Sequence, residues 1–251
     1  MHEPGRAKAA LIIPALNEEE ALPHTLAQVP PGLFSAVIVA DNGSTDGTAE
    51  VARRSGAIVV CEPRRGYGAA CQRGLAAVPP DVHAVVFLQA DGSEDPREAA
   101  RLLEPIFRGE ADLVVGSRTC QASCRLRFHQ AWGNRLAVWL IRILHGGRYT
   151  DLGPFRAVRL DALRQLRLRD RGYGWTVEMQ VRALQEGLRI LEVPVASRRR
   201  TAGRDKISGT FTGSLKAGFK ILWTILRLAL PRRVASPSGS APRPRSAPPP
   251  S

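Results

Sequence analysis

The chain has 251 residues, a hydrophobic content of 44% and a formal net charge of +13, with an isoelectric point near 10.8. This length is sufficient for one α/β domain with a full core, and the apolar content is typical of a globular protein. The positive charge predicts anionic partners such as phosphates, nucleic acid or anionic lipid. No nucleic-acid-binding module or aromatic stacking platform accompanies the charge, so a nucleic-acid partner is not expected.

The cysteines and the N-terminal residues favour an intracellular protein. Four cysteines at irregular spacing, without a secretory context, predict reduced thiols. Cys120 and Cys124 resemble half of a metal site, but no second Cys or His pair completes it. The apolar run at residues 11–13 meets Pro14 at once and is too short for a signal peptide. We therefore expect a cytoplasmic location.

Short apolar strands alternate with helical segments in the first half of the chain. The pattern predicts strands at residues 9–13, 37–40, 57–61, 84–88 and 112–116, and helices at residues 17–28, 47–55, 68–78 and 96–108. Asn17 is the expected N-cap of the first helix. Strands that alternate with helices predict an α/β fold with a mostly parallel central sheet flanked by helices.

The second half is expected to contain an apolar helix at 131–144, a loop at 151–156, a helix at 175–187 and a strand at 190–195. A cationic loop at residues 198–206 follows. We expect residues 1–8 to be flexible, residues 9–230 to form one domain, and the Pro-, Ser- and Arg-rich residues 231–251 to be a disordered tail.

The last expected helix, residues 211–230, is amphipathic. It carries a narrow polar stripe on an otherwise apolar surface, formed by Thr212, Lys216, Lys220, Thr224 and Arg227. The uncharged stretch between Lys220 and Arg227 is much shorter than the roughly 20 residues that a membrane span requires. Two interpretations remain: the helix lies in a membrane interface, or it docks on its own domain.

Polar side chains follow three of the predicted strands. Glu18 comes just after the first strand, Asp41 ends the second, and Asp91 follows the fourth. The carboxyl ends of parallel strands meet at one edge of the sheet, where α/β proteins bind ligands. A carboxylate such as Asp91 can hold a divalent cation against the phosphates of a nucleotide there.

Three of these segments carry a family resemblance: IIPALNEE at 12–19, DNGSTDGT at 41–48 and QAD at 89–91. They resemble the successive motifs of family 2 inverting glycosyltransferases with the GT-A fold, in particular the dolichol- or polyprenyl-phosphate sugar synthases. The resemblance continues through DLGPFR at 151–156, GYGWTVE at 172–178 and RTAGRDKIS at 200–208. It implies a hexosyltransferase with a nucleotide-diphosphate sugar donor, a divalent metal (Mg²⁺ or Mn²⁺), a polyprenyl-phosphate-type lipid acceptor and inversion at the anomeric carbon.

The resemblance also implies roles for individual residues. It assigns nucleotide-sugar binding to Pro14, Ala15, Asn17, Glu18, Asp41, Gly43, Ser44, Gly66, Gly68, Gln89 and Ala90. Asp91 is the implied metal ligand and catalytic residue. The chain departs from the family at Gln89, where an acidic residue is usual. A glutamine carbonyl can still coordinate a metal, Ser93 is a further candidate ligand, and Mg²⁺ often needs only one or two protein carboxylates.

The acceptor decides whether a base is needed. A lipid phosphate is already anionic, so cations can position it, whereas a hydroxyl acceptor requires a general base. Asp151 is the first candidate for that base and Glu178 the second. The candidate contacts for acceptor or donor phosphates are Arg118, Arg135, Arg199, Arg200 and Lys206. A third interpretation, a non-catalytic nucleotide-sugar-binding protein, follows from the missing first carboxylate.

A lipid acceptor would place the protein peripherally on the inner face of the plasma membrane. The sequence leaves open which nucleotide and which sugar the donor carries, because a few hydrogen bonds in the pocket decide both. It also leaves open the oligomeric state.

Overall fold

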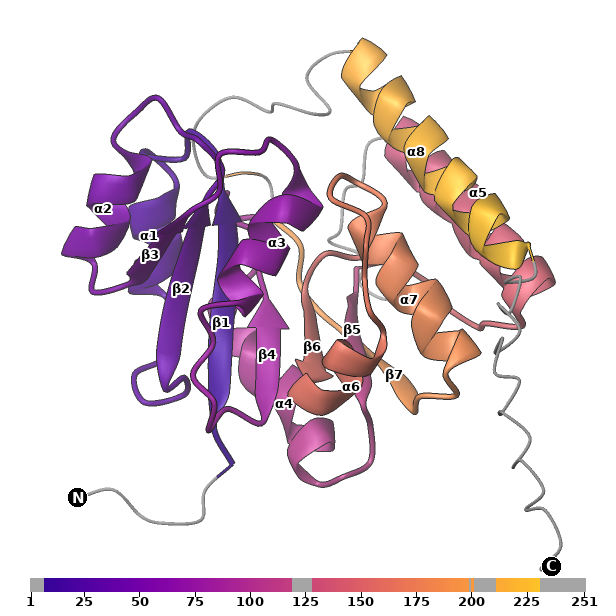
Figure 1. The fold of residues 1–251 in the computed structure, drawn as a ribbon, viewed down its shortest axis with the longest axis horizontal. Helices are drawn as coiled ribbons and strands as arrows, with labels where there is room; N and C mark the ends of the chain where they lie inside the picture. The colour runs from indigo at the N-terminus through magenta and orange to yellow at the C-terminus, as the bar shows by residue number, and fades with distance from the viewer. Residues whose placement is uncertain (1–6, 119–127, 199, 201–210, 231–251) are drawn as a thin grey trace, which may run out of the picture.

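A computed structural model describes residues 7–118, 128–198, 200 and 211–230. Arg199, Lys206, Cys120, Cys124 and most of the expected flexible N-terminus and C-terminal tail lie outside the described residues. In the described part of the chain, seven strands form one sheet in the order β3-β2-β1-β4-β6-β5-β7 (Figure 1). The strands are β1 (Ala9–Ala15), β2 (Ala36–Asp41), β3 (Ile58–Cys61), β4 (Ala84–Phe87), β5 (Leu113–Ser117), β6 (Arg156–Arg159) and β7 (Ile190–Pro194).

The sheet is mostly parallel, as the sequence predicts. β1 pairs in parallel with both β2 and β4, and β5 pairs in parallel with β7. β6 runs antiparallel to its two neighbours, β4 and β5. Pro194 is tolerated in β7 because this strand lies at the edge of the sheet, where a missing backbone donor costs no ladder hydrogen bond.

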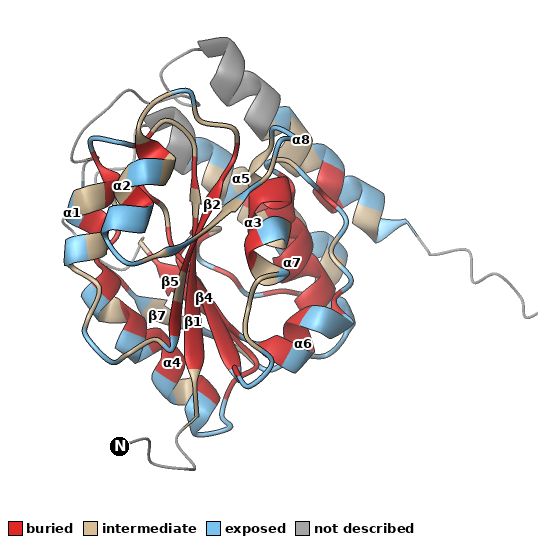
Figure 2. Cartoon of the chain, turned by 60° about the vertical axis from the view of Figure 1, so that its left-hand side comes forward, coloured by how far each residue is buried: buried red, intermediate tan, exposed pale blue. Residues whose placement is uncertain are grey.

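Helices cover both faces of this sheet. They are α1 (Leu22–Ala27), α2 (Thr48–Arg54), α3 (Tyr67–Leu75), α4 (Ala99–Phe107, preceded by a 3₁₀ turn at Pro96–Glu98), α5 (Phe128–His145), α6 (Leu160–Gln165), α7 (Trp175–Gln185) and α8 (Phe211–Ala229). Buried residues of α1, α2 and α4 pack in one hydrophobic cluster, and those of α3, α5, α6, α7 and α8 pack in another (Figure 2).

The apolar run of β1 serves both clusters. Ala10 and Ile12 belong to the cluster with α3 and α7, whereas Leu11 and Ile13 belong to the cluster with α1 and α4. Successive strand residues point to opposite faces, so a strand covered on both sides must be apolar at nearly every position. This explains why a continuous run such as Ala-Leu-Ile-Ile predicts a central strand correctly.

Trp175 ties the second layer together. Its side chain is fully buried at the start of α7 and meets the ring of Phe87 from β4 edge-on, at a centroid distance of 4.9 Å. The ring of Tyr67, the first residue of α3, approaches at 6.1 Å. One large side chain thus joins the sheet to two helices.

One expectation about elements is wrong, and two further elements were not expected. The first helix begins at Leu22 and Asn17 does not cap it: Asn17 has a left-handed φ of 48° and its side chain bonds elsewhere. The loop expected at residues 151–156 leads directly into β6 and then α6, neither of which was predicted. β6 was hidden because its four residues, Arg-Ala-Val-Arg, include a charged side chain, Arg156, that is fully buried.

α8 docks on the domain with one side and exposes the other. The ring of His145 in α5 bonds the carbonyl of Ile225 at 3.1 Å, and Gln185 in α7 donates to the carbonyl of Leu228 at 2.8 Å. The alternative in which the helix docks on its own domain is therefore confirmed. The other side of the helix remains apolar and exposed, and its contact with a membrane interface stays a prediction. No helix in the described residues combines the length and apolarity needed to cross a membrane.

The close approach of α3 to β1 generates a stability prediction. A Cβ at Gly74 would lie 2.6 Å from the Cγ2 of Ile12, which is fully buried and has no room to move. Gly74→Ala should lower the free energy of unfolding by about 1–3 kcal/mol through overpacking. Denaturant unfolding followed by circular dichroism measures this change.

The matched control is Gly133→Ala in α5. Apart from its chain neighbours and the backbone of its own helix, no atom of the described residues lies within 4 Å of a Cβ built at Gly133, which is exposed. That substitution should stabilise the helix by about 0.5–1 kcal/mol. A Gly74→Ala protein as stable as the wild type would show that α3 does not rest on β1 this closely.

Candidate active site

The loops that follow β1 and β2 are joined through Asn17. The backbone N–H of Asn17 donates to the hydroxyl of Ser44 at 2.9 Å, and its side-chain oxygen accepts from the backbone N–H of Thr45 at 2.8 Å. The N–H of Glu18 also donates to the hydroxyl of Thr48 at 2.7 Å. Asn, unlike most residues, adopts the left-handed φ that this arrangement requires. The two loops therefore form one rim, as the strand ends predicted.

Pro14, Ala15 and Asp41 lie at the strand ends beneath that rim. Parallel pairing sets Ala15 opposite Asp41, and both are buried. The carboxylate of Asp41 accepts the backbone N–H of Ser44 at 3.1 Å, which closes a tight turn through Gly43 (φ 75°). Asp41 is thus held in the turn at the carboxyl edge of the sheet.

Asn42 connects this rim to the Gly66 loop, and the sequence reasoning missed it. Its side-chain oxygen accepts the N–H of Gly66 at 2.7 Å, and its amide group donates to the carbonyl of Arg64 at 2.7 Å. The available signal was its position directly after Asp41 at a strand end.

Gly66 and Gly68 are required by the packing of the protein itself. Gly66 has a φ of 147°, and a Cβ there would overlap the carbonyl oxygen of Arg171. A Cβ at Gly68 would lie 2.8 Å from the Cβ of Trp175. These backbone contacts account for both glycines without a ligand, so close approach to a donor stays a prediction.

The loop with Gln89, Ala90 and Asp91 is held from below by two side chains that were not predicted. Thr25 of α1 donates to the carbonyl of Ala90 at 3.0 Å, and the carboxylate of Glu94 accepts the N–H of Gln89 at 2.9 Å. Asp91 itself accepts the N–H of Ser93 at 3.0 Å. The loop presents its carboxylate at the same edge of the sheet as the rim.

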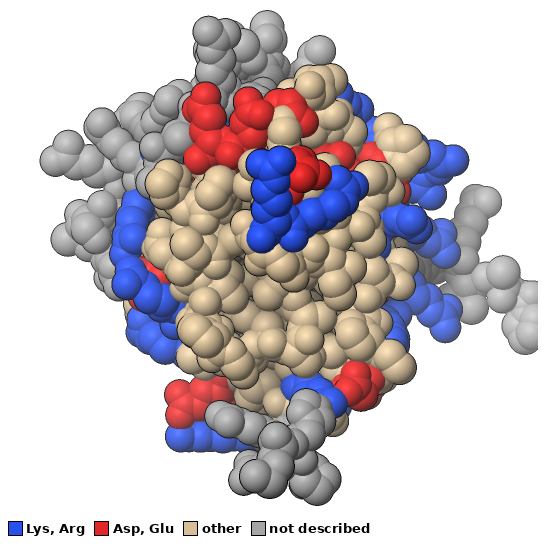
Figure 3. All heavy atoms as spheres, turned by 90° about the vertical axis from the view of Figure 1, so that its left-hand side faces the viewer, with Lys and Arg blue, Asp and Glu red and all other residues tan. Residues whose placement is uncertain are grey.

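Arg200 brings the acidic residues of β1 and β4 together. Its guanidinium forms an ion pair with Glu18, and one of its nitrogens lies 3.7 Å from a carboxylate oxygen of Asp91. The strand ends of β1 and β4 therefore lie within reach of one arginine side chain. Figure 3 shows acidic side chains gathered at this end of the molecule, on the side that carries α1 and α2.

The donor atoms around Asp91 are all hard oxygens. The Ser93 hydroxyl lies 3.3 Å from the side-chain oxygen of Gln89, so a hydroxyl, an amide and a carboxylate share this loop. Mg²⁺ and Mn²⁺ prefer such ligands. Among the described residues, no group of three His, Cys, Asp or Glu side chains is placed to hold a metal ion. A cation at Asp91 would therefore complete its coordination with a bound ligand and water.

Arg118 and Asp151 form a buried ion pair. The guanidinium of Arg118 donates to both carboxylate oxygens of Asp151, at 2.8 and 2.9 Å, and its backbone N–H adds a third bond at 2.9 Å. Burial alone would raise the pKa of Asp151, but the hydrogen bonds from Arg118 outweigh it and leave the pKa below its usual range. A carboxylate with both oxygens engaged and a lowered pKa is a poor general base.

The remaining candidates are dispersed. Glu178, the second candidate base, is buried in α7, where it accepts the N–H groups of Arg169 and Asp170 and pairs with Arg182. Arg135 is exposed on α5. Its neighbour Asn134 contacts the loop that precedes β6, where its side-chain oxygen accepts the N–H of Leu152 at 3.0 Å. Arg199 and Lys206, as noted, lie outside the described residues.

Together, the parallel sheet and the polar rim at its carboxyl edge define an α/β fold with a candidate ligand site at the ends of its strands. The family profile of glycosyl transferase family 2 matches residues 10–167. The chain therefore belongs to glycosyl transferase family 2 and is an enzyme of this kind, as the sequence motifs implied.

Relatives and solved structures agree with this family. The chain is 41% identical over 207 residues to an uncharacterized glycosyltransferase of Mycobacterium tuberculosis, covering 82% of this chain and 93% of that protein. It is 32% identical to the undecaprenyl-phosphate mannosyltransferase of Micrococcus luteus, covering 87% and 97%. A crystal structure of glucosyl-3-phosphoglycerate synthase from Mycobacterium tuberculosis, with Mn²⁺, UDP and glucosyl-3-phosphoglycerate, matches with a TM-score of 0.73 at 25% identity, covering 91% and 86%. The fold is thus the GT-A fold that the motifs implied.

The burial of Glu94 generates a pH prediction. Burial, reinforced by the nearby Asp91 charge, raises the pKa of Glu94 from 4.5 to about 8, although the Gln89 N–H opposes this shift. Between these two pKa values the folded protein keeps the Glu94 carboxyl protonated, whereas the unfolded chain has already released that proton. Stability from this group is lost as pH rises from about 4.5 to 8.

Glu94→Gln keeps an oxygen that accepts the Gln89 N–H but cannot ionise. Its melting temperature should match the wild type below pH 4.5 and exceed it above pH 8, by on the order of 5 °C. Glu104→Gln, the same change at an exposed site on α4, is the control. A melting-temperature difference that does not grow with pH would refute this account of Glu94.

Proposed function

We propose that this protein transfers a sugar from a nucleotide-diphosphate sugar to the phosphate of a polyprenyl-phosphate-type lipid, with inversion and with the help of a divalent cation. The observation that carries the choice of acceptor is the Arg118–Asp151 pair. Because both oxygens of Asp151 are engaged by Arg118, this carboxylate is not available as a general base. A phosphate acceptor needs no such base, because it is already an anionic nucleophile.

Two relatives support a lipid acceptor. The Micrococcus luteus protein is an undecaprenyl-phosphate mannosyltransferase, and the Mycolicibacterium smegmatis relative, 29% identical over 221 residues, is a polyprenol monophosphomannose synthase. The latter match covers 81% of this chain and 82% of that protein. These similarities favour a sugar donor and a polyprenyl-phosphate acceptor in this chain.

In the proposed complex the rim binds the nucleoside and the Asp91 loop faces the diphosphate. Asp41 accepts hydrogen bonds from a ribose or base, and Asn17 and Ser44 hold the shape of the rim. Arg200, which reaches both Glu18 and Asp91, is positioned to contact the donor phosphates. Arginine forks fit phosphate oxygens bidentately.

Asp91, Gln89 and Ser93 are the residues that would hold the cation. Their oxygens suit Mg²⁺ or Mn²⁺, and solved structures similar to this chain contain one or the other together with UDP. When bound, the cation supplies charge neutralisation for the departing diphosphate. The single carboxylate of this set makes the diphosphate itself an essential part of the coordination.

The lipid acceptor requires a surface that meets the membrane. α5 and α8 lie side by side on the domain (Figure 1) and each exposes apolar side chains at helical spacing. They are Trp132, Trp139 and Ile143 on α5, and Phe219, Trp223, Leu226 and Leu230 on α8. Exposed aromatic stripes of this kind lie in the headgroup region of a bilayer. We place the protein peripherally on the inner face of the plasma membrane.

A hydroxyl acceptor is the alternative. The similarity to glucosyl-3-phosphoglycerate synthase, whose crystal structures contain phosphoglyceric acid, is the observation in its favour. Asp151 would then have to leave Arg118 to accept a proton. The non-catalytic alternative, prompted by Gln89, would give neither transfer nor donor hydrolysis.

The metal role is tested at Asp91. Asp91→Asn should reduce metal-dependent sugar transfer by roughly a hundredfold or more, since charge neutralisation by a metal contributes several kcal/mol. Nucleotide binding without metal should persist, because the rim residues are unchanged. Asp161→Asn, an exposed carboxylate on α6, is the matched control. Wild-type turnover in Asp91→Asn would contradict the role of this residue.

The acceptor class is tested at Asp151. If Asp151 only positions Arg118, Asp151→Asn should raise the acceptor KM, lower kcat by roughly tenfold or less, and leave the shape of the pH–kcat profile unchanged. A general base would cost about 10²–10⁴ in kcat and remove the acidic limb of the profile. The measurement is transfer to detergent-solubilised polyprenyl phosphate, with a phosphorylated alcohol as the competing acceptor.

A further inference from the structure

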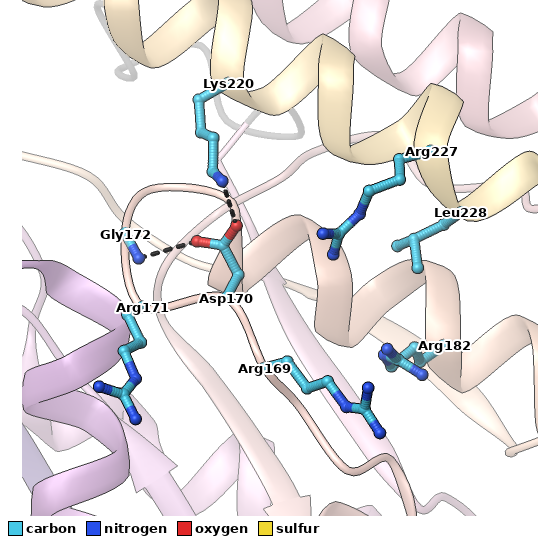
Figure 4. A pocket seen from close by; sticks show the side chains of 8 residues that line it. All are labelled: Arg169, Asp170, Arg171, Gly172, Arg182, Lys220, Arg227 and Leu228. Atoms are coloured by element: carbon cyan, nitrogen blue, oxygen red, sulfur yellow. Dashed lines mark hydrogen bonds and ion pairs between the residues drawn. The ribbon is translucent and has the colours of Figure 1, made fainter.

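A basic pocket of about 540 Å³ lies between the segment that precedes α7 and the C-terminal half of α8 (Figure 4). It is distinct from the rim and the Asp91 loop, which contribute none of its lining in the described residues. Five of the side chains that line it are cationic and one is acidic: Arg169, Arg171, Arg182, Lys220, Arg227 and Asp170.

The positive charge of this basic pocket is only partly compensated. Lys220 pairs with Asp170 at 2.8 Å, and Arg182 pairs with Glu178 at 2.7 Å. Asp170 also accepts the N–H of Gly172 at 2.8 Å, so both of its oxygens are engaged. The local acids are therefore committed to partners within the protein.

Three arginines remain at the mouth of the pocket. The side chains of Arg169, Arg171 and Arg227 are exposed and have no carboxylate partner among the described residues. They come from two different elements and line one cavity. Figure 4 shows the guanidinium groups of Arg169 and Arg227 on the same side of the loop and Arg171 on the other, so a multivalent anion can contact Arg169 and Arg227 at once. Guanidinium groups favour phosphate among such anions, because they donate two parallel hydrogen bonds to it.

The pocket borders the exposed apolar stripe of α8. Phe219, Trp223, Leu226 and Leu230 follow one another at intervals of four, three and four residues, which places them on one face. Lys220 and Arg227 each come one residue after a member of that stripe and therefore lie along its edge. A basic flank beside an apolar face is the pattern of a helix that lies at a membrane surface.

We propose that this basic pocket binds the phosphate headgroup of an anionic phospholipid, while the stripe on α8 contacts the acyl region beside it. The proposal rests on the membrane contact proposed above and adds to it a second phosphate site, separate from the acceptor. Charge complementarity and the adjacent apolar stripe together select a membrane phospholipid over a soluble phosphate, which would use the arginines but leave the stripe in water.

The test uses the full chain and vesicles, without donor or acceptor. Co-sedimentation is compared for vesicles of phosphatidylcholine alone and with added phosphatidylglycerol. The triple variant Arg169→Gln, Arg171→Gln, Arg227→Gln should bind the anionic vesicles roughly tenfold or more weakly than the wild type, since juxtamembrane basic residues contribute strongly to such binding. Binding to neutral vesicles, which depends on the stripe, should change little.

A charge-matched control separates a site from general attraction. Arg53→Gln, Arg54→Gln, Arg108→Gln removes three exposed arginines from α2 and the end of α4. If both triple variants lose binding to anionic vesicles equally, the loss follows from net charge alone, and the proposed phospholipid site is wrong. Circular dichroism and the melting temperature confirm folding, and the single variant Arg227→Gln, an exposed position, gives a smaller loss in the same direction.

Two further arms fix the source of the phosphate and the link to the proposed function. Soluble glycerol phosphate should not displace the protein from anionic vesicles; displacement would assign the pocket to a soluble ligand and overturn the lipid assignment.

Transfer to detergent-solubilised polyprenyl phosphate should be unchanged in the triple variant of the pocket. A protein that binds vesicles through this pocket but transfers no sugar contradicts only the proposed function. One that transfers sugar while the pocket variant binds vesicles like the wild type contradicts only the pocket.

Discussion

The parallel pairing of β1 with β2 and β4 is the constraint on which the candidate site depends. Because Ala15 stands opposite Asp41, and Ile12 opposite Phe87, the chain leaves all three strands at one edge of the sheet. Asn17 then fixes the loop after β1 through two hydrogen bonds to the loop after β2. The buried strands supply the rigidity, and the loops that they position carry the polar groups. A site assembled from segments far apart in sequence follows directly from this topology.

Arginines hold the two important carboxylates in different ways. Arg118 engages both oxygens of the buried Asp151 at hydrogen-bond distance, an arrangement in which loss of either partner leaves a costly unpaired charge. Arg200 instead approaches Asp91 at 3.7 Å, at a position that is still partly accessible. A divalent cation with a diphosphate can replace the longer contact far more readily than the bidentate one. The geometry therefore favours a structural role for Asp151 and is compatible with the metal role proposed for Asp91.

The central strands and the acidic residues at their ends could be predicted because both depend on local sequence. An apolar run buried on both faces has few other solutions, and Asp41 and Asp91 interrupt such runs directly. The same reasoning did not predict β6, because nothing in the local sequence indicates that the charged Arg156 is buried. The Arg118–Asp151 pair joins residues 33 positions apart, and Glu94 acquires its raised pKa only through burial beneath Gln89. Such contacts arise from tertiary packing, which no spacing rule encodes.

The two surfaces of α8 place opposite demands on its surroundings. Exposed Phe219 and Trp223 are most stable away from water, whereas the exposed guanidinium of Arg227 beside them requires hydration or an anion. Lys220, on the same flank, already pairs with Asp170. Bulk water satisfies only the cations, and the hydrocarbon core of a bilayer satisfies only the aromatic rings. The interface between them satisfies both, because the rings enter the acyl boundary while the basic side chains stay at the phosphate level. This balance supports the proposal that the helix lies along a membrane rather than across it, which agrees with its short uncharged stretch between Lys220 and Arg227.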